Sequence, residues 1–135
     1  MFLIDTNVWL ELLLEQEKAA EARRFFTETE ASLLSITDFA LYSIGVILIR
    51  LRKDGVFRDF LTDVLEDSGV RKIHLETGDL KEVITAGRQF QLDFDDAYQL
   101  VAAEKFDLTI VSFDADFDRT RRGRKAPSEA IAGSL

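Results

Sequence analysis

Short apolar segments rich in β-branched residues alternate with longer segments of helical periodicity along the chain. This alternation predicts a three-layer α/β/α fold, in which helices cover both faces of a mainly parallel sheet of about four to five strands. Predicted strands span 2–5, 31–35, 70–75 and 108–112, and predicted helices span 8–13, 18–29, 39–52, 56–65, 77–90 and 93–105. Sheets of this class bind ligands beyond the carboxyl ends of their strands, so functional residues are expected at that edge.

Length and composition restrict the function classes. The 135 residues predict one domain over 1–135. The chain has no cysteine and a single histidine, His74, which excludes thiolate and multi-histidine zinc sites and disfavours Ser-His-Asp chemistry. Neither a signal peptide nor an apolar run of about 20 residues is visible, so we expect a soluble, cytoplasmic protein. A net charge of −8 argues against nucleic-acid binding driven by bulk charge, but it allows a local basic patch.

Acidic side chains follow the predicted strands or open the helices at three places. Asp5 ends the first strand, and two further groups stand in LDFDDAYQ and SFDADFD; they are Asp93, Asp95, Asp96, Asp114, Asp116 and Asp118. Asp93 and Asp96 would share one helix face, with Asp95 about 100° away. Taken singly, each acid is explained by helix capping and by the helix dipole. We expect that explanation to hold for Asp95 and Asp118.

The combination of the three groups points to a metal site. Carboxylates that converge on one sheet edge repel one another unless protons or cations neutralise them. Sites built only from oxygen ligands select hard cations such as Mg²⁺ or Mn²⁺, which activate water and stabilise phosphoryl displacement.

Other acidic motifs fit the chain less well. The segment from Asp114 begins like an EF-hand loop, but Arg119 stands where glycine is needed and Lys125 where the last glutamate is needed. A phosphatase of the haloacid dehalogenase type is a weaker alternative, because its acidic motif belongs on the first strand. No phosphate-binding glycine loop is present.

Three segments, in order, resemble the PIN-domain family and its VapC-type toxin ribonucleases. FLIDTNVWL is similar to the opening strand of that family, DFDDAYQLVAAEK to its DA-containing helix with Asp96 as the matching acid, and IVSFDADF to its T-x-D-x-D-F segment with Ser112 in the threonine place. The resemblance runs essentially from end to end. It implies a three-layer PIN fold and a metal-dependent endoribonuclease, as in the toxin of a toxin–antitoxin pair.

The resemblance also implies roles for individual residues. Mg²⁺ or Mn²⁺ would be held by Asp5, Asp96 and Asp114, the catalytic carboxylates, with Asp116 as an outer or second ligand. Independently of the resemblance, Thr6 and Asn7 can orient Asp5 or a metal-bound water, and they can equally cap the helix that follows. RNA is the implied substrate, a small antitoxin the implied protein partner, and a homodimer the implied assembly.

One departure from the family pattern concerns the central helix. Where the family carries a glutamate, ITDFALYSIG places Ser43. Asp38 cannot replace it, because it lies about 140° around the helix, whereas Asp93 can compensate from the Asp96 face. Two readings follow. The chain is a weakened nuclease, or it is a PIN scaffold that binds a protein or RNA partner without cutting.

Basic residues gather just after Asp114. Arg119, Arg121 and Arg122 are candidate RNA contacts that would steer a phosphate backbone towards the acids. The alternative is a solvated basic tail.

Overall fold

Four parallel strands form the centre of the molecule, in a computed structural model that describes residues 1–133. The strands are β1 (Phe2–Ile4), β2 (Leu34–Thr37), β3 (Arg71–Ile73) and β4 (Thr109–Val111), in the order β3-β2-β1-β4. In the register of the sheet, Leu3 of β1 lies opposite Ser35 of β2 and Ile110 of β4. The predicted parallel α/β sheet is confirmed.

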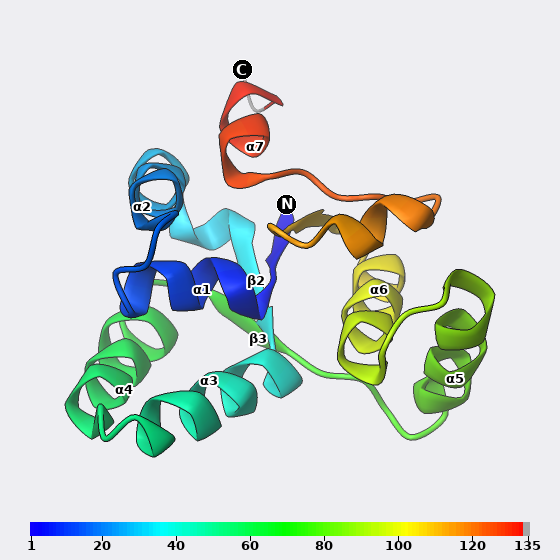
Figure 1. Cartoon of the computed structure of the whole chain (residues 1–135), viewed down its shortest axis with the longest axis horizontal. Helices are drawn as coiled ribbons and strands as arrows, with labels where there is room; N and C mark the ends of the chain where they lie inside the picture. The colour runs from blue at the N-terminus through cyan, green and yellow to red at the C-terminus, as the bar shows by residue number, and fades with distance from the viewer. Residues whose placement is uncertain (134–135) are drawn as a thin grey trace.

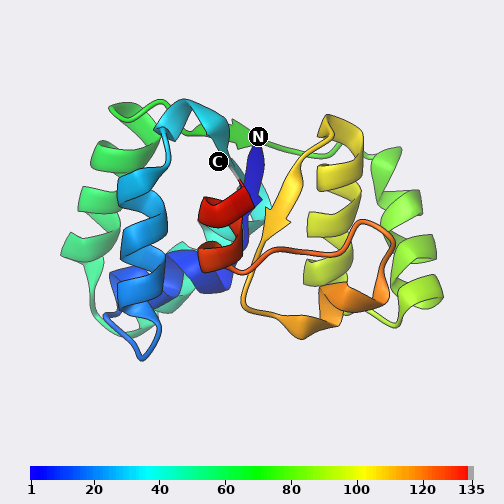
Figure 2. The ribbon, with the colours of Figure 1, turned by 90° about the horizontal axis from the view of Figure 1, so that it is seen from above.

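Two helical layers cover the sheet, as Figures 1 and 2 show. One layer contains α1 (Thr6–Leu13), α2 (Ala19–Glu28), α3 (Asp38–Arg50) and α4 (Asp54–Phe60), and α7 (Pro127–Gly133) packs on α2. The other layer contains α5 (Asp79–Phe90) and α6 (Phe94–Phe106). Successive strand residues point to opposite faces, so Leu3 joins the core under α5 and α6 while Ile4 joins the core under α1–α4. The predicted three-layer architecture is therefore present.

Several boundaries differ from the predicted ones. The predicted strand 31–35 is a 3₁₀ helix over Ala31–Leu33, followed by β2. The buried side chains that β2 places in the sheet begin only at Leu34, which explains the shift. The predicted helix 56–65 starts earlier, at Asp54, and continues from α4 into a π-helical segment, η2 (Leu61–Glu66).

The chain after Asp114 is folded against the sheet edge. A 3₁₀ helix, η3 (Ala115–Arg119), follows β4, and Lys125 then forms a parallel bridge with Val111. The amide of Ser112 donates to the carbonyl of Lys125 at 3.0 Å. The description of this stretch as a solvated tail is therefore wrong, because its backbone extends the hydrogen-bonding pattern of β4.

The strand order places a crevice beside β1. The chain passes from β1 to β2 and β3 on one side of the sheet and returns to β4 on the other side of β1. At such a switch in direction the loops leaving neighbouring strands diverge, which opens a binding crevice at their carboxyl ends. Asp5 follows β1 and Ser112 follows β4 at this point. Within residues 1–133, no helix is long and apolar enough to cross a membrane.

Candidate metal centre

An acidic pocket of about 340 Å³ lies at the carboxyl end of β1. Its lining residues are Asp5, Thr6, Asn7, Leu10, Phe39, Ser43, Ile47, Asp95, Asp96, Gln99 and Asp114. They come from α1, α3, α6 and the loop after β4. The fold thus brings together the three acidic groups that the sequence singles out.

Asp5 is buried and held through both of its carboxylate oxygens. Its Oδ1 accepts the amide of Thr6 at 2.9 Å and Nε2 of Gln99 at 3.2 Å, and its Oδ2 accepts the hydroxyl of Ser112 at 2.7 Å. A carboxylate offers about four acceptor positions, so one remains free for a cation. Asp5 also serves as N-cap of α1, so its capping role and its place in the pocket coexist.

Ser112 joins the end of β1 to the end of β4. Its hydroxyl oxygen accepts hydrogen bonds from Nδ2 of Asn7 at 3.3 Å and from the amide of Asp114 at 2.9 Å, and its O–H donates a hydrogen bond to Oδ2 of Asp5. The Oδ1 of Asn7 accepts the amide of Phe113 at 3.2 Å. A single buried hydroxyl therefore fixes Asp5 relative to the backbone of Asp114.

Three carboxylates form a cluster that can hold a metal ion. Oxygens of Asp96, Asp114 and Asp116 lie within 4.8 Å of one another, and Asp5 lines the same pocket as Asp96 and Asp114. Asp116 is shared with another partner, because its Oδ1 accepts Nη2 of Arg119 at 2.7 Å. An all-oxygen set of this size fits a hard divalent cation.

The acidity of Asp96 reflects this crowding. Burial raises the pKa of Asp96 to about 8, with further contributions from the charges of Asp5, Asp114 and Asp95 and from a hydrogen bond to Asp114. Burial also raises the pKa of Asp5, which its hydrogen bonds from Ser112 and Gln99 partly oppose. Without a cation, the pocket therefore retains a proton on Asp96 at neutral pH.

The metal-free protein is expected to lose stability as the pH rises from about 4 to about 8. The carboxyl of Asp96 titrates near 3.8 when unfolded and near 8 when folded. The folded state thus binds more protons between these values, so the unfolding free energy falls with pH there and levels off above. Asp96→Asn should flatten this slope in melting curves recorded in a chelator. Asp107→Asn, at an exposed position, is the control, and equal slopes in the wild type and Asp96→Asn would contradict the assignment.

Asp95 and Asp93 lie the other way round from the expectation that Asp93, and not Asp95, belongs to the site. Asp95 lines the pocket, whereas Asp93 is not among the lining residues that the structure describes. The helical angle used for Asp93 does not apply, because α6 begins at Phe94 and Asp93 has extended backbone angles. Asp93 is therefore not placed to compensate for a missing glutamate. Ser43, on α3, does line the pocket and is half-buried.

Gln99 is a pocket residue that the sequence did not reveal. Its side chain is buried, donates to Asp5 and accepts the hydroxyl of Thr37 at 2.7 Å. Thr37 in turn caps α3 by accepting the amide of Ala40. Gln99 thus ties α6 to β1 and β2. The available signal was its spacing of one helical turn from Asp96, which places both on one face.

The three candidate RNA-contact arginines have different surroundings. Arg119 donates to Asp116 and to the carbonyl of Gln91, and Arg122 donates to the carbonyl of Leu108 at 2.8 Å. Arg121 is exposed and has no side-chain hydrogen bond or ion pair within residues 1–133. Of the three, Arg121 alone has a guanidinium without an internal partner in that part of the chain.

Parallel strands, a switch in strand order and converging carboxylates define an α/β protein with a candidate cation site at its sheet edge. The PIN domain family model matches residues 2–123. The chain belongs to the PIN-domain family.

Three solved structures share the fold. The toxin–antitoxin complex from Klebsiella pneumoniae has a TM-score of 0.75 at 18% identity, covering 94% of this chain and 98% of that one. VapC20 of Mycobacterium tuberculosis, a toxin that cleaves the sarcin–ricin loop, has a TM-score of 0.74 at 17% identity, covering 87% of this chain and 93% of that one. PAE2754 from Pyrobaculum aerophilum has a TM-score of 0.71 at 18% identity, covering 98% of this chain and 93% of that one. A search of curated proteins gave no significant match.

Proposed function

We propose that the chain is a divalent-metal-dependent endoribonuclease of the PIN type, acting as the toxin of a toxin–antitoxin pair. The observation that carries this proposal is the cluster of Asp96, Asp114 and Asp116, set beside the buried Asp5 at the switch in strand order. Membership of the PIN family supports it, as do structural neighbours described as a toxin–antitoxin complex and as an RNA-cleaving toxin.

Asp5, Asp96 and Asp114 would hold Mg²⁺ or Mn²⁺, and Asp116 would be the outer ligand. The bound ion supplies charge neutralisation at the phosphodiester and a lowered pKa for the attacking water. Binding displaces the proton that Asp96 holds, so affinity is expected to rise with pH up to about 8.

The remaining pocket residues position these carboxylates. Ser112 and Asn7 fix Asp5 against the backbone of Asp114, and Gln99 fixes its other oxygen. Outer partners of this kind commonly affect metal affinity or activity by about 10- to 100-fold. Leu10, Phe39 and Ile47 line the same pocket and would limit the water beside a bound phosphodiester.

We also propose two protein partners. An antitoxin is suggested by the relatives, one of which is a toxin–antitoxin complex. A homodimer is suggested by an exposed apolar surface on and just after α3, composed of Tyr42, Val46, Ile49 and Leu51. Tyr42, Val46 and Ile49 follow one another at spacings of four and three residues and so share one face of α3, and adjoining exposed apolar residues are typical of contact sites. Molar mass in solution decides between monomer and dimer. A cytoplasmic location stays a prediction.

A non-enzymatic PIN scaffold is the second candidate. The observation that favours it is Ser43, which lines the pocket without adding a negative charge. On this reading the acidic pocket is a remnant, and the chain binds a protein or RNA partner without cutting.

The direct test combines metal binding with RNA cleavage. Calorimetric titration with Mn²⁺ is expected to show saturable binding with release of a proton near neutral pH, and single-stranded RNA should be cleaved in Mn²⁺ but not in a chelator. Proton release is measured by repeating the titration in buffers of different ionisation enthalpy. Absence of binding up to millimolar Mn²⁺ would contradict the nuclease proposal and favour the scaffold.

A further inference from the structure

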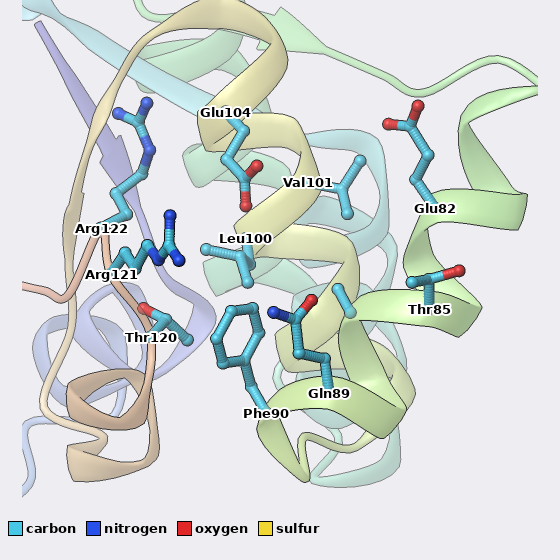
Figure 3. A pocket seen from close by; sticks show the side chains of 11 residues that line it. Glu82, Thr85, Gln89, Phe90, Leu100, Val101, Glu104, Thr120, Arg121 and Arg122 are labelled. Carbon is cyan, nitrogen blue, oxygen red and sulfur yellow. The ribbon is translucent and has the colours of Figure 1, made fainter.

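A second cavity, of about 780 Å³, lies between α5, α6 and the segment 120–122 (Figure 3). Its volume is within the roughly 300–1,000 Å³ of typical ligand sites. Leu100, Val101 and Ala86 are buried and form an apolar base. Around them stand Glu82, Thr85, Gln89, Phe90, Glu104, Thr120, Arg121 and Arg122.

Most charged groups of this cavity have no internal partner. Within residues 1–133, the side chains of Glu82, Glu104 and Arg121 make no hydrogen bond or ion pair. Arg122 donates to the carbonyl of Leu108 and also pairs with Asp107 at 3.5 Å. Figure 3 shows both arginines along one wall and Glu82 on the opposite side. The two signs balance, so the cavity favours a ligand that carries an anion at one end and hydrogen-bond donors at the other.

The side chain of Arg119 connects the wall of the cavity to the acidic cluster. Arg119 donates to Oδ1 of Asp116 at 2.7 Å and to the carbonyl of Gln91 at 2.6 Å. Asp116 belongs to the acidic cluster, and Gln91 directly follows Phe90 of the cavity wall. A nucleotide strand that left the acidic cluster past Arg119 would meet this wall next.

We propose that this cavity binds a nucleotide of the single-stranded RNA that flanks the cleaved linkage. The base lies against Phe90 and the apolar base of the cavity, and its phosphate contacts Arg121. Glu82 and Glu104 accept hydrogen bonds from exocyclic amino groups, which favours adenine, cytosine or guanine over uracil. The inference rests on the proposed ribonuclease function and extends it by a subsite outside the acidic pocket.

The ring and the free guanidinium favour RNA over a peptide as occupant. A stacked base and a phosphate use Phe90 and Arg121 together, and the neighbouring acidic cluster supplies the place where the same strand is cut. A peptide would use the apolar base of the cavity but would have no need of the short connection through Arg119.

Fluorescence anisotropy with a labelled twelve-nucleotide single-stranded RNA in a chelator tests the subsite without cleavage. Arg121→Gln is expected to raise Kd at least about fivefold and to lower the slope of log K against log salt by about 0.7, the value for one phosphate contact on a single strand. Phe90→Leu is expected to raise Kd at least about fivefold, from lost base stacking, with the salt slope unchanged. A polyuridine probe should bind more weakly than polyadenosine.

Matched controls come from the same chain. Arg23→Gln removes an exposed arginine on α2, and Phe106→Leu changes a partly exposed phenylalanine outside the cavity lining; both should bind RNA like the wild type. Thermal melts show that each variant folds. Should Phe90→Leu fail to fold, Arg121→Gln, at an exposed position, still decides the question.

The results separate the subsite from the cleavage activity. Weaker RNA binding by the cavity variants supports the subsite, even if the wild type cleaves nothing in Mn²⁺ and the nuclease proposal fails. If both cavity variants bind RNA with the affinity and salt slope of the wild type, the subsite is overturned, even if cleavage is found. A peptide is then the better candidate for the occupant of the cavity. RNA binding absent in the wild type also overturns it.

Discussion

Asp114→Asn is expected to lower cleavage of single-stranded RNA in Mn²⁺ by at least about 100-fold. Loss of a residue that only supports a metal ligand costs about 10- to 100-fold, and loss of a proposed ligand itself should cost at least the upper value. The substitution removes a charge from the acidic cluster while keeping the local fold. Oδ1 of Asp114 accepts the amide of Asp116 at 2.8 Å, and an asparagine oxygen can accept the same bond. Calorimetry should show the accompanying loss of Mn²⁺ binding.

The control is Asp59→Asn, which changes an exposed acid on α4. The side chain of Asp59 makes no hydrogen bond or ion pair within residues 1–133, and it lines neither the acidic pocket nor the second cavity. Asp59→Asn should cleave like the wild type. Retention of cleavage by Asp114→Asn, at an unchanged melting temperature, would remove Asp114 from the site and refute the proposed role of the acidic cluster.

Asp5 is a less clean position for the same test. Its Oδ2 accepts the Ser112 hydroxyl, whose oxygen already accepts Asn7 and the amide of Asp114. In Asp5→Asn, a side-chain amide nitrogen in the place of Oδ2 would face a hydroxyl with no acceptor left, and turning that amide would set it against Gln99 and the amide of Thr6. Loss of activity in this variant would therefore mix lost metal binding with a disrupted network.

The sheet and the convergence of the acids could be predicted from local sequence. Strand-like segments alternate with helical ones, and parallel strands share one carboxyl edge, so Asp5 and Asp114 had to approach each other once β1 and β4 were neighbours. Asp96 is one of two acids in the first turn of α6, and both of them line the pocket at the same edge.

Residues whose roles depend on distant partners could not be predicted. Gln99 acts through Thr37 and Asp5, which lie far from it in sequence. Arg119 was expected to be available to RNA, but it bridges Asp116 and Gln91, which belong to different elements. Asp93 was expected on the helix face of Asp96, but it is the N-cap of α6 and has extended backbone angles, so a helical angle does not apply to it.

Ser43→Glu is expected to raise Mn²⁺ affinity and RNA cleavage at least about tenfold. Ser43 lines the same pocket as the carboxylates, and its side chain makes no hydrogen bond within residues 1–133, so no contact is lost. An added negative charge attracts a cation about 4 Å away by about 1–4 kcal/mol per unit charge, depending on the dielectric, and 1.4 kcal/mol is a factor of ten. Affinity is measured by calorimetry and cleavage under the same conditions as for the wild type.

The melting temperatures of the metal-free and the Mn²⁺-bound protein distinguish this charge effect from a general change in stability. In a chelator, the glutamate adds repulsion to a pocket where Asp96 already keeps a proton because of its burial and its charged neighbours, so the melting temperature should fall. In saturating Mn²⁺ the same charge is neutralised, so the metal should raise the melting temperature more than in the wild type. Ser43→Gln, of equal length and no charge, should show neither effect. If Ser43→Glu lowers the melting temperature in the chelator but gains neither affinity nor cleavage, the pocket no longer binds a catalytic ion and the scaffold function is correct.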